Sequence, residues 1–191
     1  DMDGLLFDSE RIVQRSWEIA GDELGIQHMG DVIYHTLGMN RAGRNEYFRK
    51  YIREDFPFEE FGKLTRDNFW KIVDKEGLPL KKGAKELLAY GKSQGYKMAV
   101  ATSSSREYAM GNLIRAGIDS HFGSVVCGDM VKKAKPDPEI YQKASESLGI
   151  PPEYCMAFED APGGILSAHQ AGMKVIMVPD LVQPTQEIRE L

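Results

Sequence analysis

The sequence predicts an α/β fold with a parallel sheet, and a separate all-helical segment inserted near the N-terminus. The first observation is that four short apolar runs alternate with four amphipathic segments after Pro79. Such alternation is typical of βαβ units, whose parallel sheet is covered by helices on both faces. The second observation is that residues 9–78 have helical periodicity and no convincing strand. We therefore expect a discontinuous α/β core, residues 1–8 and 79–191, and a helical lobe, residues 9–78.

The elements follow from the apolar periods. In the helical lobe, apolar residues recur at three- and four-residue steps, which predicts helices over 9–24, 45–53 and 58–73. Aromatic residues at this spacing are expected to form the core of the lobe. The predicted strands of the α/β core are 97–105, 124–129, 153–160 and 174–180. The predicted helices of the α/β core are 81–95, 106–117, 137–149 and 161–172, and each ends on a glycine.

Composition excludes several classes of function. The chain has 191 residues, a hydrophobic fraction of 42% and a net charge of -5. It carries no basic footprint for nucleic acid and no 18-residue apolar stretch for a membrane. Cys127 and Cys155 lie in apolar runs, which favours buried free thiols over a disulfide. We expect a cytoplasmic protein with a small-molecule partner, and nothing in the sequence indicates its oligomeric state.

The first stretch, DMDGLLFDSE, is the centre of the functional prediction. Asp1 and Asp3 are two positions apart, so their side chains point to the same side of an extended backbone. Two carboxylates this close repel one another unless a cation lies between them, and oxygen ligands suit Mg²⁺. Gly4 allows the backbone to turn away. The alternative interpretation is an ordinary acidic surface turn.

Other polar groups gather where the predicted strands end, which is where ligands bind in open parallel sheets. They are Thr102, Ser103 and Ser104 at the end of one strand, Lys135 after the next, and Glu159 and Asp160 at the end of the third. Each has a simpler explanation on its own: helix caps for the serines, a solvated side chain for Lys135, and helix-start acids for Glu159 and Asp160. Their joint occurrence at strand ends favours a site.

Together, these residue types fit the transfer of a phosphoryl group. The carboxylates of Asp1, Asp160 and Glu159 would hold Mg²⁺. Thr102, the Ser103 backbone N–H and Lys135 would bind phosphate oxygens. Asp1 would attack phosphorus and form an aspartyl-phosphate. Asp3 would protonate the leaving oxygen and later activate water.

The same motifs identify a resemblance. The sequence resembles the haloacid dehalogenase superfamily, on its β-phosphoglucomutase-like phosphatase branch. The stretches that carry this resemblance are, in order, DMDGLLFDSE, AVATSSS, KPDPEIY and AFEDAPGGILSAHQAGM. The resemblance implies a Rossmann-like core with a helical cap domain, here residues 9–78. It also implies Asp1 as nucleophile, Asp3 as acid/base, and Mg²⁺ held by Asp1, the Asp3 carbonyl, Glu159 and Asp160. Thr102 and Lys135 would bind the phosphoryl group. The first strand of the family ends on the nucleophile, so we expect residues of the natural protein to precede Asp1.

The superfamily covers several reactions. Asp3 and the Glu159–Asp160 pair argue against a dehalogenase, which has no second aspartate and needs no Mg²⁺. The mutases of the family hold a second phosphate with a Gly–x–x–Arg stretch, which residues 38–41 resemble. Arg41 is therefore either a substrate contact or a solvated loop arginine. The mutases also have a histidine where Val13 stands, which favours a phosphatase.

We therefore expect a Mg²⁺-dependent phosphatase of small phosphorylated metabolites, with sugar phosphates as the expected substrates. The first alternative is a sugar-phosphate mutase. An alternative of another class is a phosphate-accepting signalling domain, against which the helical lobe argues.

Overall fold

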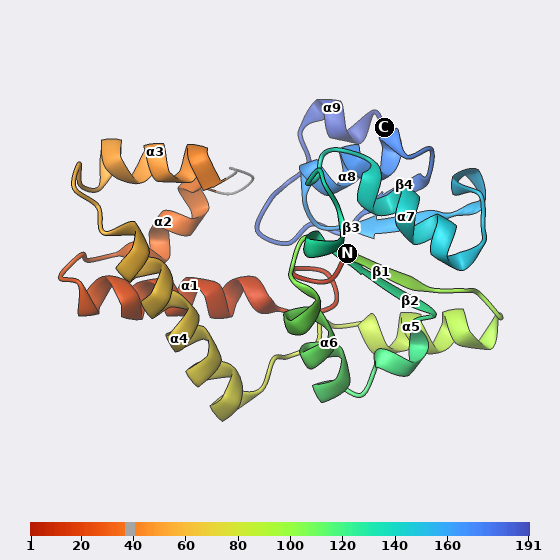
Figure 1. Ribbon diagram of the computed structural model, residues 1–191, viewed down its shortest axis with the longest axis horizontal. Helices are drawn as coiled ribbons and strands as arrows, with labels where there is room; N and C mark the ends of the chain where they lie inside the picture. Colours follow the sequence, from red (N-terminus) through yellow and green to blue (C-terminus); the bar gives the residue numbers. More distant parts are fainter. Residues whose placement is uncertain (37–40) are drawn as a thin grey trace. The chain divides into compact units, whose positions relative to one another are not determined.

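A computed structural model describes residues 1–36 and 41–191, and leaves the side chains of residues 41 and 42 undescribed. The chain divides into two compact units. Unit 1 comprises Asp1–Asp8 and Pro79–Leu191, and unit 2 comprises Ser9–Leu78. Figure 1 labels their helices and strands.

Unit 1 contains two parallel strand pairs in its described residues. The strands are β1 (Ala99–Thr102), β2 (Ser124–Cys127), β3 (Met156–Glu159) and β4 (Lys174–Met177). β1 pairs with β2, and β3 pairs with β4, both in parallel. The predicted parallel pairing is confirmed, but the four strands do not form one continuous hydrogen-bonded sheet. The Asp1 backbone nitrogen donates to the Phe158 carbonyl at 2.8 Å. This hydrogen bond joins β3 to the N-terminal segment of the chain and not to β1.

The described residues of unit 1 also form five α-helices, and those packed on the strands bury a core rich in alanine. They are α5 (Ala84–Ser93), α6 (Arg106–Arg115), α7 (Glu139–Leu148), α8 (Pro162–Gln170) and α9 (Gln186–Arg189). α7 packs on β1 and β2, while α8 packs on β3 and β4. The buried cluster between them consists of Ala101, Val126, Ile140, Tyr141, Ala144, Ala157, Ala168, Ala171 and Met173. Small side chains let the helices lie close to the strands, and this close packing holds the strand ends in place against the helices.

The described residues of unit 2 are helical. The helices are α1 (Ser9–Glu23), α2 (Met29–Thr36), α3 (Arg41–Tyr51) and α4 (Phe58–Glu76). The prediction missed α2, whose sequence resembles a glycine-containing loop. Gly30 lies in the first turn of this helix, and its N–H donates to the Glu18 carboxylate at 2.7 Å. A Cβ at this position would crowd that carboxylate, which accounts for the glycine.

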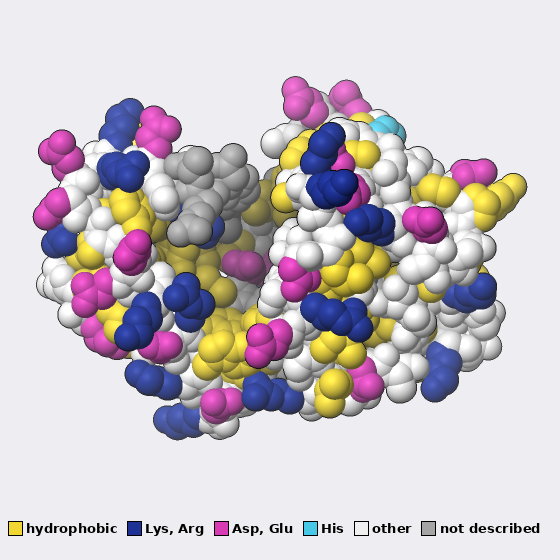
Figure 2. All heavy atoms as spheres, viewed as in Figure 1, with side chains coloured by type: hydrophobic (Ala, Val, Ile, Leu, Met, Phe, Trp, Pro, Cys, Tyr) yellow, Lys and Arg dark blue, Asp and Glu magenta, His cyan; other side chains and the backbone are white. Residues whose placement is uncertain are grey.

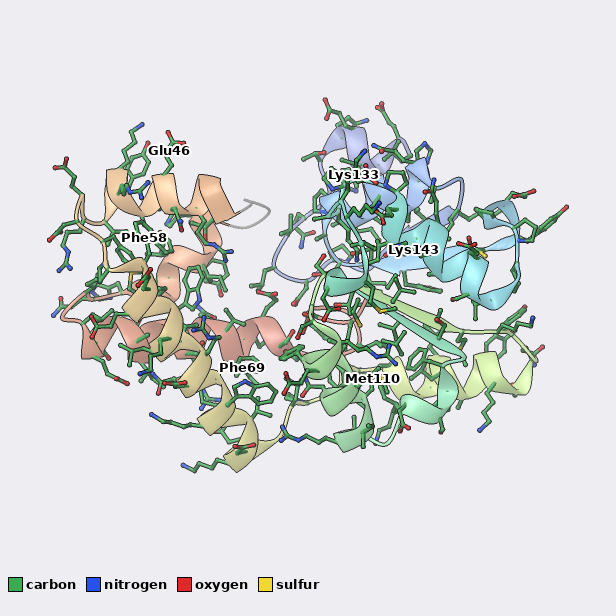
Figure 3. All side chains as sticks on the ribbon, in the orientation of Figure 1. Glu46, Phe58, Phe69, Met110, Lys133 and Lys143 are labelled. Atoms are coloured by element: carbon green, nitrogen blue, oxygen red, sulfur yellow. The ribbon has the colours of Figure 1, made fainter. Side chains whose placement is uncertain are left out.

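Aromatic rings fill the interior of unit 2, as the helical spacing predicted. Phe48 is 3% exposed and contacts the rings of Trp17, Phe56, Phe58 and Phe61. Phe58 and Phe69 both extend from α4 in Figure 3. Such ring contacts add to the stabilisation that burial itself provides.

The surface carries charged side chains of both signs, and the two cysteines are free thiols. Acidic and basic side chains are interspersed over the face in Figure 2. Cys127 and Cys155 are free, as predicted, but only Cys127 is fully buried. None of the helices in the described residues combines the length and the apolar character that crossing a membrane requires.

Candidate active site

The N-terminal turn sets the direction of the first two acids. The Met2 carbonyl accepts backbone N–H groups from Leu5, Leu6 and Phe7, and Gly4 has a φ of 73°. Met2 is fully buried, whereas Asp1 and Asp3 are half-buried. A Cβ at Gly4 would collide with the Asp160 carboxylate, so glycine allows this turn to lie against β3's end.

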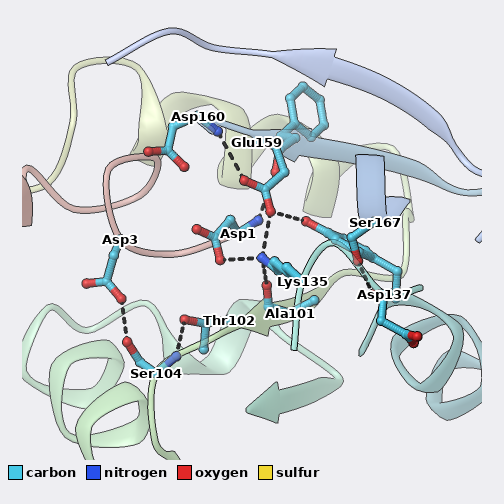
Figure 4. Close-up of polar contacts among 12 residues, drawn as sticks. Asp1, Asp3, Ala101, Thr102, Ser104, Lys135, Asp137, Glu159, Asp160 and Ser167 are labelled. Carbon is cyan, nitrogen blue, oxygen red and sulfur yellow. Dashed lines mark hydrogen bonds and ion pairs between the residues drawn. The ribbon is translucent and has the colours of Figure 1, made fainter. Parts of the chain in front are cut away.

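Lys135 joins three parts of the site. Its ammonium donates to Asp1 Oδ1 at 2.9 Å, to Glu159 Oε1 at 2.6 Å and to the Ala101 carbonyl at 2.9 Å (Figure 4). The side chains of Lys135 and Asp1 are 10% and 13% exposed. One lysine therefore links the N-terminal turn to the ends of β1 and β3.

Three carboxylates meet beside this lysine. One oxygen each from Asp1, Glu159 and Asp160 lies within 4.8 Å of the other two. Three carboxylates and one ammonium leave a formal charge of minus two, which a divalent cation would balance. Gly164 makes the cluster possible, because a Cβ at that position would overlap the Glu159 carboxylate.

Glu159 is ionised despite its burial. Its side chain is 1% exposed, and desolvation by itself would raise the carboxyl pKa. The charge of Lys135, the charge of the Asp1 amino group and the hydrogen bonds from Lys135 and Tyr141 together outweigh burial, so the net pKa lies below its ordinary value. The Tyr141 hydroxyl donates to Glu159 Oε1 at 2.6 Å. Burial, followed by the Glu159 charge, raises the Tyr141 pKa well above its ordinary value, so the phenol stays a donor.

The Asp3 carboxylate has different partners. Ser104 Oγ donates to Asp3 Oδ2 at 2.7 Å, and the Tyr108 hydroxyl donates to Asp3 Oδ1 at 3.1 Å. Both donors follow β1, and Figure 4 shows Asp3 directed toward Ser104. In the described part of the chain, the cluster of mutually close carboxylates contains Asp1, Glu159 and Asp160 and not the Asp3 side chain.

The remaining predicted site residues lie at or near the same strand end. Thr102 closes β1 and is 1% exposed, and its hydroxyl oxygen accepts the Ser104 N–H at 3.1 Å. Ser103 follows it and is exposed. A Cβ at Gly128 would collide with the Ser103 carbonyl, so glycine lets these two loops approach. The Gly–x–x–Arg stretch and the side chain of Arg41 lie outside the described residues.

Sequence reasoning did not assign a role to several contacts. The sequence left Ser104 or Ser105 as the possible helix cap; Ser105 is the N-cap of α6, and Ser104 binds Asp3 instead. Tyr108 and Tyr141 were not singled out, since phenols in helices usually pack in the core. The available signals were the position of Tyr108 one turn after the hydroxyl cluster and that of Tyr141 within the KPDPEIY motif.

Known proteins are similar to this chain in sequence and in fold. The Bacillus subtilis protein YhcW, provisionally named a phosphatase, is 33% identical over 189 residues, covering 97% of this chain and 84% of its own length. The phosphorylated carbohydrates phosphatase of Thermotoga maritima is 31% identical over 176 residues, covering 92% and 81%. A Thermotoga maritima crystal structure provisionally assigned as a β-phosphoglucomutase superposes with a TM-score of 0.82 at 28% identity, covering 100% of this chain and 88% of that one.

A family match spans most of the sequence. Residues 1–178 match the family described as haloacid dehalogenase-like hydrolase. This match and the relatives named as phosphatases confirm the predicted fold class and enzyme class. The chain belongs to the haloacid dehalogenase-like hydrolase family.

Proposed function

We propose that this chain is a Mg²⁺-dependent phosphatase of small phosphorylated metabolites that works through an aspartyl-phosphate on Asp1. The observation that carries the proposal is the position of the Asp1 carboxylate, which contacts the Lys135 ammonium and also lies in the three-carboxylate cluster. A nucleophile for a phosphate ester needs this environment, because both it and its substrate are anions.

The residues divide the chemistry as follows. An Asp1 oxygen forms a bond to phosphorus as the bond from phosphorus to the ester oxygen breaks. Asp3 gives a proton to that leaving oxygen. The Asp3 carboxylate left by this step takes a proton from water, which attacks phosphorus and breaks its bond to Asp1. Inorganic phosphate is released, and Asp1 is restored as the carboxylate and Asp3 as the carboxylic acid. The Lys135 ammonium, the Thr102 hydroxyl and the Ser103 N–H bind the phosphoryl oxygens.

The donor set fits Mg²⁺. It consists of oxygen atoms alone, and its formal charge is minus two with Lys135 included. Asp1, Asp160, Glu159 and the Asp3 backbone carbonyl would hold the ion. When bound, Mg²⁺ would offset the repulsion between the Asp1 carboxylate and the phosphoryl oxygens.

We propose sugar phosphates as the substrate class and unit 2 as the helical cap that selects among them. The first part is supported by the relative named for phosphorylated carbohydrates. The second is supported by the division of the chain, since Ser9–Leu78 folds as its own unit between two segments of unit 1. Arg41 is the proposed substrate contact of this cap.

A phosphate-release assay tests the proposal. The full-length protein and its Asp1→Asn variant are incubated with a panel of sugar phosphates and p-nitrophenyl phosphate, in Mg²⁺ and in EDTA. We expect release that needs Mg²⁺ and that falls by roughly a thousandfold or more in the variant. Absence of release from every ester would contradict the proposal. Isomerisation of β-glucose 1-phosphate in the same samples would favour a mutase.

A further inference from the structure

Two hydroxyl groups hold the Asp3 carboxylate, one on each oxygen. Ser104 Oγ lies 2.7 Å from Oδ2, and the Tyr108 hydroxyl lies 3.1 Å from Oδ1. A carboxylate with a donor on each oxygen is restrained in its rotation as well as in its position. Asp3 is the residue whose orientation matters most for proton transfer in the proposed mechanism.

The helix start fixes Tyr108. Ser105 is the N-cap of α6, and its Oγ accepts the Tyr108 N–H at 3.4 Å. The Arg106 N–H is bound by Asp129 Oδ2 at 3.0 Å, and Ala109 is fully buried. The first turn of α6 is therefore anchored on three sides. The phenol ring has two side-chain torsions, so an anchored backbone leaves its hydroxyl few other positions.

We infer that Tyr108 is a positioning residue for Asp3, and that its hydroxyl orients this carboxyl group for proton transfer to the leaving oxygen. The inference rests on the proposed function and extends it to a residue outside the metal and phosphate groups. Tyr108 acts through Asp3 and makes no bond to the substrate. Ser104 supplies the second restraint.

The choice of substrate separates this role from a structural one. A sugar alkoxide is a poor leaving group and needs the proton that Asp3 provides, whereas nitrophenolate leaves as a stable anion. A misplaced Asp3 therefore slows the alkyl ester more than the aryl ester. A general disturbance of the site slows both.

The test measures kcat/KM of Tyr108→Phe on one sugar phosphate and on p-nitrophenyl phosphate. Loss of one hydrogen bond to the Asp3 carboxyl group corresponds to about a tenfold decrease on the sugar phosphate. We expect the decrease on p-nitrophenyl phosphate to be less than about twofold. Asp3→Asn provides the reference for complete loss of proton transfer. Tyr90→Phe on α5, where the tyrosine is 57% exposed, is the matched control and should leave both values unchanged.

The outcomes are distinguishable. Equal decreases on both esters, or no decrease on either, would overturn the role of Tyr108 and leave the proposed function intact. A wild-type protein that hydrolyses neither ester would overturn the proposed function and the inference with it. Should Tyr108→Phe fold poorly in a thermal unfolding scan, Ser104→Ala removes the other donor. The same selective loss on the sugar phosphate is expected there, and an unselective loss would contradict the inference.

Discussion

The interior of unit 2 buries aromatic side chains, whereas the strand ends of unit 1 bury charged ones. In unit 2, Phe48 is surrounded by other aromatic rings, and the burial of apolar area stabilises the helices directly. At the strand ends of unit 1, Lys135 and Glu159 are almost as well covered, although both carry charge. Buried charges contribute to stability only while each keeps its partners. We therefore expect an aromatic substitution to reduce stability alone, and a charge substitution to reduce stability and chemistry together.

The largest effect is expected for Lys135→Met. The change leaves the buried Glu159 without its cation and removes the proposed phosphate contact. Breaking a buried pair costs about 3–5 kcal/mol, and we expect phosphate release to fall by roughly a thousandfold. Urea unfolding in EDTA and the phosphate assay measure the two losses. Lys133→Met in the same loop is the control, because the Lys133 side chain is 74% exposed (Figure 3). Unchanged stability of Lys135→Met would contradict the comparison.

Phe48→Ala should affect stability alone. Truncating a buried phenylalanine costs about 3–5 kcal/mol. Asp1, Lys135, Glu159 and Asp160 all belong to unit 1, so the folded fraction should hydrolyse p-nitrophenyl phosphate at the wild-type rate. Denaturant unfolding and activity per folded molecule check this. Tyr51→Ala on the same helix, at a residue 60% exposed, should cost less than about 1 kcal/mol. A large loss of activity per folded molecule in Phe48→Ala would show that the two units are not separable in this way.

Gly164→Ala tests how closely α8 approaches the acids. Its Cβ would overlap the Glu159 carboxylate, which is buried and has little room to withdraw. Overpacking of this kind costs about 1–3 kcal/mol, and we expect activity to fall by about tenfold or more. The neighbouring Gly163→Ala is the control, because a Cβ there meets nothing within 4 Å. Alanine at 163 should stabilise the helix by roughly 0.5–1 kcal/mol. Equal behaviour of the two variants in activity and thermal unfolding would contradict the expectation.

The smallest effect is expected for Glu139→Gln. The Glu139 carboxylate binds Lys143, 2.9 Å away, and the backbone N–H groups of Lys132 and Lys133, in the loop that carries Lys135. The hydrogen bond from Lys143, followed by that from the Lys132 backbone, lowers its pKa from 4.5 to about 2. Because the folded pKa is depressed, the stabilisation is complete above pH 4.5 and disappears as the pH falls through about 2.

Thermal unfolding of wild type and Glu139→Gln between pH 2 and 7 measures this effect. The difference in Tm should be constant above pH 4.5 and should shrink toward zero near pH 2. Glu146→Gln, an exposed acid on the same helix, is the control and should show no comparable difference. A difference that grows on acidification would contradict the assignment.

Much of the fold could be predicted because local signals agreed with it. The alternation of apolar runs and glycine-terminated helices identified the elements of unit 1, and ring spacing identified the interior of unit 2. Helix α2 was missed because Gly30 disfavours a helix locally, and only the neighbouring Glu18 explains its place. The sequence also did not show that the strands form two separate pairs or that the Asp1 nitrogen bonds to Phe158, because both depend on contacts between segments far apart in the chain.

By itself, the sequence determined the kinds of residue available for chemistry: the acids of the first turn, and the hydroxyls, the lysine and the further acids at or after the ends of predicted strands. Such placement is readable because strand ends are local features and side-chain chemistry is carried by residue type. Only the tertiary structure decided which of them meet. Lys135 bridges Asp1 and Glu159, while Asp3 turns to Ser104 and Tyr108. These choices depend on distances between segments about a hundred residues or more apart in most cases, and on glycines whose missing Cβ atoms allow the approach.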